Sequence, residues 1–578
     1  MAQDKTAPPQ MGRKSRRIEG SFYGYRSLSL WFLMPWTQNF VTLRAMRTRS
    51  VFSALACLLL VAGALSSQAA TALPQHLFFR VMAGEAVHAP VSGRLLVFIE
   101  KGTGAKQISI NEFEPNSTWV AAREVHDLDP GAAIDVDTDQ IAFPKPFSDL
   151  APGTYQVQAV LDVNHTYNYS GLTAGDLISP VVSLANWTPG KGAEPVLTLS
   201  SVVPPPAPPK MSPEAEDAVE HHMQLAVYQS PVLTKFWGRP IDVRAWVVLP
   251  PDYDHDKTRH YATVYWTHGF GGDLEYCEQM GVRIYERMAE GKMPPMIWVM
   301  LDEHLPTGTH EFANSVNDGP WGTALVEEYI PWLESRYRMD DRPDARFLQG
   351  HSSGGWASLQ LEVNYPQFFG GTWSTSPDPS TFYDFTGINL YAPHANVYHR
   401  PDGTAYPLVR AHGKVLATFE QFAKLEVVLG PYGGQIASFD WVFSPRGKDG
   451  RPEPMFDRTT GDVYPKVVDY WRDHYDLAHI VQTTWTERGP YLKGHIHLYV
   501  GTADTFYLNG AARKFDAVLE KLGADEHFTF RKGCSHFDLY AKDGDRMALI
   551  DTIAAQMYLE AYPGATAKWG KLADEQYP

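Results

Sequence analysis

The sequence predicts two folded parts: a small all-β domain, and after it a larger α/β domain with a mostly parallel central sheet. Three observations carry this prediction. Residues 70–203 hold short alternating apolar runs, residues 204–210 are rich in proline, and residues 211–578 alternate buried strands with helices. A chain of 578 residues is long enough to form two such cores.

The first 69 residues are interpreted as a leader and signal peptide. Arginines within residues 44–49 precede the uncharged apolar run VFSALACLLLVAGAL at 51–65, and small residues follow it. This order is typical of a secretory signal. The run is short for a membrane span, which needs about 20 residues, although an uncleaved anchor is the alternative. Because Met46 begins a signal of ordinary shape, we interpret residues 1–45 as a mis-assigned start or a long basic leader.

In the first domain, the runs Arg94–Ile99 and Tyr155–Leu161 have the character of short strands, and Pro152-Gly153 marks a turn before the second. Long helical periods are absent, so residues 70–203 are predicted to form a sandwich-like all-β domain. The segment PPPAPP within 204–210 can form neither a helix nor a strand ladder, and it favours a stiff linker.

In the second domain, Ala245–Pro250 is predicted to be a strand that ends at its proline. The runs Ala262–Trp266 and Met296–Leu301 are almost continuously apolar, as expected for strands buried on both faces. Apolar residues at helical spacing predict a helix over Gly322–Tyr337. Strands that alternate with helices in this way indicate a mostly parallel sheet.

Charge and cysteine content exclude several classes of protein. The formal net charge is −16, and because residues 1–69 carry +7, the remainder carries −23. This balance disfavours nucleic acids and anionic membranes as partners. Only Cys277 and Cys534 lie outside the leader, so disulfides do not build the fold. A single bridge between these two cysteines is left open.

The most informative motif is GHSSGG at residues 350–355. The apolar run Ala345–Gln349 precedes it and a predicted helix follows, which is the setting of a nucleophile elbow. Glycines at 350 and 354 lack the Cβ atoms that would block so tight a turn. We predict that Ser352 is a catalytic nucleophile; a glycine-rich turn without chemistry is the alternative.

A serine nucleophile needs a histidine base and usually an acid that orients it. Asp504 follows the predicted strand 495–500, and His536 follows the predicted strand 528–530, with a helical stretch at 510–522 between them. Serine, acid and histidine in this order are typical of one hydrolase architecture. We predict Asp504 as the orienting acid and His536 as the general base. The alternatives are that Asp504 is a helix N-cap or turn residue, and that His536 is a partly buried histidine in a loop.

Other histidines fit the role of base less well. Four of them precede Asp504, which breaks the expected order: His268, His351, His495 and His497. His527 follows Asp504, but it begins the predicted strand instead of lying on the loop after it.

The fourth catalytic element is expected after the strand 262–266, which ends in THGFGG at 267–272. Acyl transfer passes through a tetrahedral oxyanion that backbone N–H groups stabilise. In this architecture one donor follows the nucleophile and the other comes from an early strand-to-helix loop. The predicted donors are therefore Ser353 and Phe270, and a flexible glycine turn is the alternative.

Together these motifs resemble the esterase D-like esterases, which include feruloyl, acetylxylan and enterochelin-type esterases, S-formylglutathione hydrolase and mycolyltransferases. The resemblance spans about residues 225–560 and rests on THGFGG, on Glu328–Pro331 with Tyr337-Arg338, on GHSSGG, on Gly501–Asp504, and on Ser535-His536. It implies an α/β-hydrolase with Ser352, Asp504 and His536 as the catalytic triad. The all-β domain lies outside the resemblance.

One departure from compact family members is the stretch of 121 positions from Ser374 to His495. We predict a cap-like insertion over about 379–493 that holds Tyr383, Phe385, Tyr391, Tyr398, Trp441, Phe443, Tyr470 and Trp471. These aromatic residues are expected either to line a substrate pocket or to form the cap's own core. Aromatic rings also stack on sugars and phenolic groups, which mildly favours a carbohydrate-linked or hydroxycinnamoyl ester.

The sequence therefore predicts an exported serine esterase, secreted or periplasmic, that acts on a small-molecule or carbohydrate-linked ester. The alternatives are an acyltransferase to a sugar or alcohol, and a secreted binding protein with a vestigial hydrolase domain. We expect no cofactor and no metal, because neither a nucleotide-binding glycine loop nor metal-ligand spacing is evident. No nucleic acid partner is expected, and no stable membrane insertion after signal cleavage.

Overall fold

The computed structural model describes residues 76–165, 170–205, 211–430 and 434–577. The predicted leader and signal over residues 1–69 lie outside the described residues, as does most of the predicted linker. Within the described ranges, none of the helices combines the length and apolar character that crossing a membrane requires.

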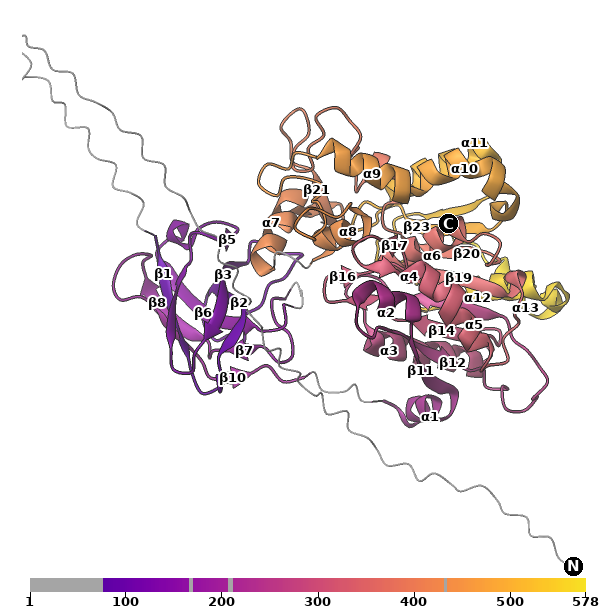
Figure 1. The fold of residues 1–578 in the computed structure, drawn as a ribbon, viewed down its shortest axis with the longest axis horizontal. Coiled ribbons are helices and arrows are strands. Elements are labelled where there is room, and N and C mark those ends of the chain that lie inside the picture. The colour runs from indigo at the N-terminus through magenta and orange to yellow at the C-terminus, as the bar shows by residue number, and fades with distance from the viewer. Residues whose placement is uncertain (1–75, 166–169, 206–210, 431–433, 578) are drawn as a thin grey trace, which may run out of the picture. The chain divides into compact units, whose positions relative to one another are not determined.

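Residues 78–202 form two β-sheets that share one apolar core (Figure 1). The smaller sheet has the order β4-β1-β9, and the larger has the order β10-β7-β6-β2-β3-β5 with β8 beside β6. The strands are β1 Phe78–Ala83, β2 Val91–Lys101, β3 Thr118–Leu128, β4 Ala133–Asp137, β5 Ala142–Phe143, β6 Gly153–Asp162, β7 Leu177–Ile178, β8 Val182–Trp187, β9 Val196–Leu199 and β10 Ser201–Val202. The strands predicted at Arg94–Ile99 and Tyr155–Leu161 lie inside β2 and β6.

The second part has an eight-stranded sheet of order β11-β12-β14-β13-β19-β20-β23-β24. All pairs from β14 to β24 are parallel, and only β12 runs against its neighbours, so the predicted mostly parallel sheet is confirmed. The strands are β11 Met223–Gln229, β12 Asp242–Val248, β13 Thr263–Thr267, β14 Ile297–Leu301, β19 Arg346–His351, β20 Thr372–Thr375, β23 Ile496–Gly501 and β24 His527–Arg531.

Helices cover both faces of this sheet, as Figure 1 shows. Successive residues of β13 point to opposite sides, so Trp266 packs in a core with α3 and α12, whereas Tyr265 packs with the helices before β19. The helices are α1 Pro213–His222, α2 Pro231–Trp237, α3 Leu274–Ala289, α4 Trp321–Thr323, α5 Ile330–Glu334, α6 Ser353–Asn364, α11 Asn509–Leu522, α12 Ala548–Ala561 and α13 Thr566–Ala573. Short hairpins pair β15 His304–Leu305 with β16 Gly308–Thr309, and β17 Asn314–Ser315 with β18 Gly319–Pro320.

The structure corrects one expectation from the sequence and answers one question that the sequence leaves open. The helix predicted over Gly322–Tyr337 is broken into α4, a π-helical turn at Ala324–Tyr329 and α5. Pro331 has no N–H to donate, and the regular ladder is lost beside it. The open disulfide hypothesis is wrong, because Cys277 and Cys534 are both free. Cys277 is buried on α3.

The insertion between β20 and β23 folds into a helical cap. It consists of β21 Pro407–Ala411, β22 Lys414–Thr418, α7 Phe419–Leu429, α8 Gln435–Phe443, α9 Pro465–Tyr475 and α10 Leu477–Leu492. Its aromatic residues share one core with α6 and β23, so the insertion is packed onto the sheet domain rather than hinged away from it. Trp471 is fully buried there, whereas Tyr383 is half exposed.

Helix α7 also contacts the β-sheet part of the chain. Leu425, Val428 and Leu429 pack against a cluster that includes Phe98 of β2. The buried Arg94 guanidinium donates hydrogen bonds to the backbone carbonyl oxygens of Val427 and Val428 at 3.0–3.1 Å. These contacts give the last turn of α7 the donors that a helix C-terminus lacks.

Candidate active site

The parallel strands bring the predicted catalytic segments to one edge of the sheet. The register pairs Thr267 of β13 with Gly350 of β19, and Gly350 with Ser374 of β20. Ser374 in turn pairs with Leu498 of β23. Loops that leave the carboxyl ends of these strands therefore lie close together, and this is where α/β sheets commonly bind ligands.

Ser352 occupies a strained turn between β19 and α6. Its φ is +61° and its ψ is −124°, a conformation that side-chain-bearing residues rarely adopt. The turn is held by the Ser352 N–H, which donates to the Thr375 carbonyl at 3.0 Å, and by Asp378, whose N–H donates to the Ser352 carbonyl at 3.2 Å. The strand-turn-helix setting predicted for GHSSGG is thus present.

The flanking glycines are required by close backbone contacts. A Cβ on Gly350 would collide with the Gly354 carbonyl, and a Cβ on Gly354 would collide with the carbonyls of Thr267 and His268. Rigid backbone cannot move aside as a flexible side chain can, so the turn tolerates only glycine at these positions.

Replacing Gly354 with alanine is expected to lower the free energy of unfolding by about 1–3 kcal/mol or more, the usual cost of overpacking. It should also reduce any esterase activity, because the turn that presents Ser352 must shift. Gly564→Ala is the matched control, since a Cβ there meets no atom within 4 Å. Urea unfolding of both variants measures the difference; equal stability would contradict the close-packing explanation.

Asp504 and His536 meet as the sequence predicts. His536 Nδ1 lies 2.9 Å from Asp504 Oδ2, and both side chains are buried. The other carboxylate oxygen accepts N–H groups from Phe506 at 2.9 Å and Leu508 at 3.2 Å. Burial alone would raise the pKa of Asp504, but His536 and these backbone donors outweigh it and hold the pKa below its usual range. Asp504 is therefore ionised near neutral pH.

Ser352 lies beside this pair without a direct hydrogen bond to it. The backbone N–H of His536 also donates to Thr505 Oγ1 at 3.4 Å, and aromatic rings lie around its imidazole. The ring of His351, next to Ser352 in the chain, lies 4.4 Å from the ring of His536. Catalytic hydrogen bonds are often long in free enzymes and shorten when substrate binds.

The predicted oxyanion loop lies directly against the elbow. A Cβ built on Gly269 would be 3.0 Å from Ser352 Cβ, a tight contact that the glycine avoids. The Gly272 N–H closes the turn around Phe270 and Gly271 by donating to the Gly269 carbonyl at 3.1 Å. Ser353 starts α6, where the first backbone N–H groups have no partner inside the helix. This arrangement suits Phe270 and Ser353 as the two donors.

His268 supports the oxyanion loop and is not paired with Ser352. The Glu303 N–H donates to His268 Nε2 at 3.0 Å, and Nδ1 lies 2.8 Å from the Gly269 carbonyl. Nε2 therefore accepts and Nδ1 donates, which fixes the carbonyl that precedes Phe270. Burial raises the pKa of Glu303 to about 8, so this carboxyl is mostly neutral at pH 7.

Sequence reasoning missed Asp378, a buried carboxylate beside the elbow. It follows β20, the strand next to β19, so it also occupies a position from which an acid could reach the site. Its Oδ2 instead accepts a hydrogen bond from Ser353 Oγ at 2.6 Å, while His536 pairs with Asp504. Burial raises the pKa of Asp378 to about 6. The signal available in the sequence was an aspartate shortly after the strand that follows the elbow.

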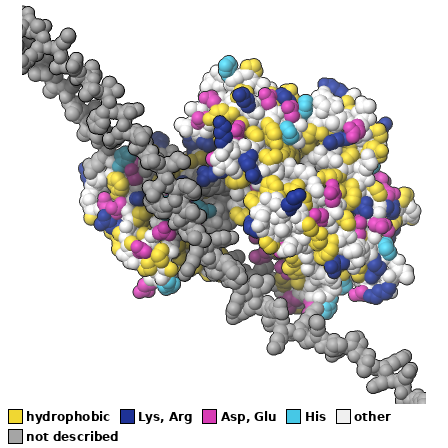
Figure 2. Space-filling view, viewed as in Figure 1, with side chains coloured by type: hydrophobic (Ala, Val, Ile, Leu, Met, Phe, Trp, Pro, Cys, Tyr) yellow, Lys and Arg dark blue, Asp and Glu magenta, His cyan; other side chains and the backbone are white. Residues whose placement is uncertain are grey.

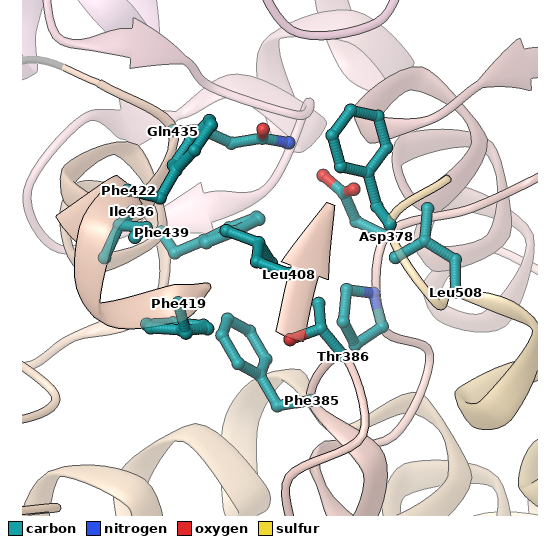
Figure 3. Close-up of a pocket in the computed structure, with 12 residues that line it drawn as sticks. Asp378, Phe385, Thr386, Leu408, Phe419, Phe422, Gln435, Ile436, Phe439 and Leu508 are labelled. Atoms are coloured by element: carbon teal, nitrogen blue, oxygen red, sulfur yellow. The ribbon is translucent and has the colours of Figure 1, made fainter. Parts of the chain in front are cut away.

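A pocket lies beside the Asp378 carboxylate (Figure 3). Residues of the insertion form most of its wall, including Phe385, Leu408, Phe419, Ile436 and Phe439. Asp378 and Gln435 are polar members of the lining. Phe385 lines this pocket and also packs in the core of the insertion.

Within the described ranges, no group of three or more His, Cys, Asp or Glu side chains is arranged to hold a metal ion. On the face shown in Figure 2, Lys and Arg side chains are scattered among acidic and hydrophobic side chains and do not form one basic patch.

A mostly parallel sheet with an elbow after β19, an acid after β23 and a histidine after β24 defines the class: this is an α/β-hydrolase.

Residues 238–547, more than half of the chain, match the family described as Putative esterase, and the chain belongs to this family.

Several known proteins are similar to this chain. Esterase Rv1288 of Mycobacterium tuberculosis (strain ATCC 25618 / H37Rv) is 32% identical over 177 residues, which cover 29% of this chain and 36% of the relative. The Iron(III) enterobactin esterase of Dickeya dadantii (strain 3937) is 28% identical over 128 residues, which cover 21% and 29%. The chain therefore spans about a third of the length of the curated relatives it matches.

Among solved structures, a ferulic acid esterase aligns with a TM-score of 0.36 at 14% identity, covering 58% of this chain and 98% of the other. An S-formylglutathione hydrolase from Agrobacterium tumefaciens aligns with a TM-score of 0.34 at 14% identity, covering 59% and 95%.

Proposed function

We propose that this chain is an exported serine esterase that hydrolyses carboxylic esters through an acyl-enzyme intermediate. The observation that carries the proposal is the buried Asp504–His536 pair beside the Ser352 elbow. Membership of an esterase family supports ester hydrolysis as the reaction. Export rests on the apolar run 51–65, which lies outside the described residues.

In the proposed mechanism, Ser352 Oγ attacks the ester carbonyl carbon and its proton passes to His536 Nε2. The carbonyl oxygen becomes an oxyanion, to which the N–H groups of Ser353 and Phe270 donate. When the tetrahedral intermediate collapses, the C–O bond to the alcohol breaks, and the alcohol leaves with the proton from His536. Water then repeats the sequence on the acyl-enzyme and releases the acid.

Asp504 acts through His536 in this scheme. Its carboxylate holds the proton of the imidazole on Nδ1, so that Nε2 is free to accept a proton, and it stabilises the imidazolium that forms. The low pKa of Asp504 keeps it charged throughout the neutral range.

The substrate is proposed to be a small-molecule or carbohydrate-linked ester. Relatives named as esterases, among them an iron(III) enterobactin esterase, support an ester as the substrate.

A fluorophosphonate probe tests this proposal, because it phosphonylates only a serine that an adjacent base activates. We expect one equivalent of probe on the peptide that contains Ser352, as located by mass spectrometry. Heat-unfolded protein serves as the control and should not react. A folded protein that takes up no probe would instead support the alternative of a binding protein with a vestigial hydrolase domain.

A further inference from the structure

Residues that line the pocket in Figure 3 contact all three members of the proposed triad. Asp378 of its lining donates its N–H to the Ser352 carbonyl at 3.2 Å. Leu508 donates its N–H to Asp504 Oδ1 at 3.2 Å, and the Phe506 ring meets the His536 ring edge-on at 5.0 Å. The pocket therefore lies next to the residues proposed to carry the reaction.

The pocket is small. Its cavity volume is about 30 Å³, and one water needs roughly 10–15 Å³ on this scale. The space is therefore small, and it fits a short group better than a long chain. Buried aromatic and aliphatic side chains limit any enlargement, because each packs against other buried rings, as Phe385 does against Phe439 and Phe419.

One end of the pocket is polar. In Figure 3 the Asp378 carboxylate and the Gln435 amide extend toward each other across the cavity. The carboxylate is only 2% exposed, and it accepts hydrogen bonds from Ser353 Oγ and from Gln435. A carboxylate has about four lone-pair sites, so these two neutral donors leave acceptor capacity. A purely apolar ligand would exclude water from this carboxylate without giving it a donor, which is unfavourable.

Most side chains that line the pocket are buried, and this bears on which side of the ester the pocket binds. In the proposed mechanism the alcohol takes its proton from His536, and Phe537, the next residue in the chain, is 67% exposed. The acyl group stays on Ser352 until water arrives, so it fits the enclosed space.

We propose that this pocket is the acyl site of the esterase, and that it selects a short acyl group of two or three carbons bearing a hydroxyl that donates to Asp378. This inference rests on the proposed esterase function. It makes Asp378 a specificity-determining residue, and it assigns α8 of the insertion, with Gln435 and Ile436, to recognition of the acyl chain.

Ethyl lactate and ethyl isobutyrate test the polar end, because they differ only in a hydroxyl in place of a methyl group. We expect kcat/KM for lactate to be at least about tenfold higher after each rate is divided by that of hydroxide-catalysed hydrolysis. In Asp378→Asn, which keeps the shape and the Ser353 contact, this ratio should fall at least about fivefold. The control Asp543→Asn, an exposed aspartate, should leave the ratio unchanged.

Acyl length tests the size of the pocket. Ethyl octanoate should react at least about 100-fold more slowly than ethyl propionate, whereas octyl propionate should react within about tenfold of ethyl propionate. Ile436→Ala should raise the octanoate-to-propionate ratio several-fold, and it reports on the pocket even if Asp378→Asn fails to fold. Equal sensitivity to acyl and alcohol length would overturn the assignment of the acyl side.

The remaining outcomes separate the two proposals. Equal wild-type rates for lactate and isobutyrate would overturn the hydroxyl selection while Ser352-dependent hydrolysis leaves the esterase function standing. Faster turnover of ethyl alaninate than of lactate would show that the carboxylate selects an ammonium group, and would also overturn it. Absence of Ser352-dependent hydrolysis of every ester, propionate included, would overturn the proposed function itself.

Discussion

Ser352→Ala is expected to lower kcat for ester hydrolysis by about 10⁴–10⁶-fold, the range typical of a lost serine nucleophile. The alanine removes the only atom that forms the acyl-enzyme, while the backbone N–H groups of the proposed oxyanion hole stay in place. Initial rates with p-nitrophenyl acetate, measured at saturating substrate, give the change.

The fold should survive this substitution, because the Ser352 turn is held by backbone hydrogen bonds to Thr375 and Asp378 rather than by the hydroxyl. Urea unfolding of Ser352→Ala should match the wild type closely. Ser335→Ala, an exposed serine after α5, is the matched control and should keep full activity. Retention of wild-type turnover by Ser352→Ala would rule out Ser352 as the nucleophile.

Asp504→Asn is expected to lower kcat by about 10³–10⁴-fold with KM little changed. Asparagine fits the same space, but its amide has no charge to stabilise the imidazolium, and it can favour the wrong tautomer of His536. Asp543→Asn again serves as the control at an exposed site. A loss of less than tenfold would indicate that another acid orients His536, and Asp378 would then be the first residue to test.

The same substitution should change how stability depends on pH. The pKa of Asp504 is depressed in the folded protein, so its charge contributes stability above its unfolded pKa, about 3.9. That contribution is lost as the pH falls through the lower folded pKa. The difference in unfolding free energy between wild type and Asp504→Asn should be larger at about pH 5 than below about pH 4. Urea unfolding across this range measures it.

The strands and the Ser352 turn could be predicted because they depend on local sequence patterns. The buried strands at 262–266 and 296–301 became β13 and β14, and the glycine-flanked Ser352 took up the strained turn. Each of these features depends on neighbours within a few residues, so periodicity and turn chemistry are sufficient to predict them. The order of Asp504 and His536 likewise followed from strand-loop alternation along the chain.

Most of what the sequence missed depends on contacts between distant segments. One miss was local, because Pro331 inside the predicted helix 322–337 has no N–H to donate and the regular helix is broken beside it. Asp378 looked like any loop aspartate, because its neighbour Gln435 is 57 positions away and comes from a different element. The two cysteines seemed able to pair, yet each remains a free thiol.

The sequence by itself determined the fold class, the reaction type and the residues proposed to carry it, because an elbow, an acid and a histidine must each follow a strand in a fixed order. The tertiary structure alone decided what the pocket beside them can hold. Pocket size and the polar pair of Asp378 and Gln435 arise where the insertion packs over the end of β20. Such packing joins residues that are far apart along the chain, and no local pattern records it.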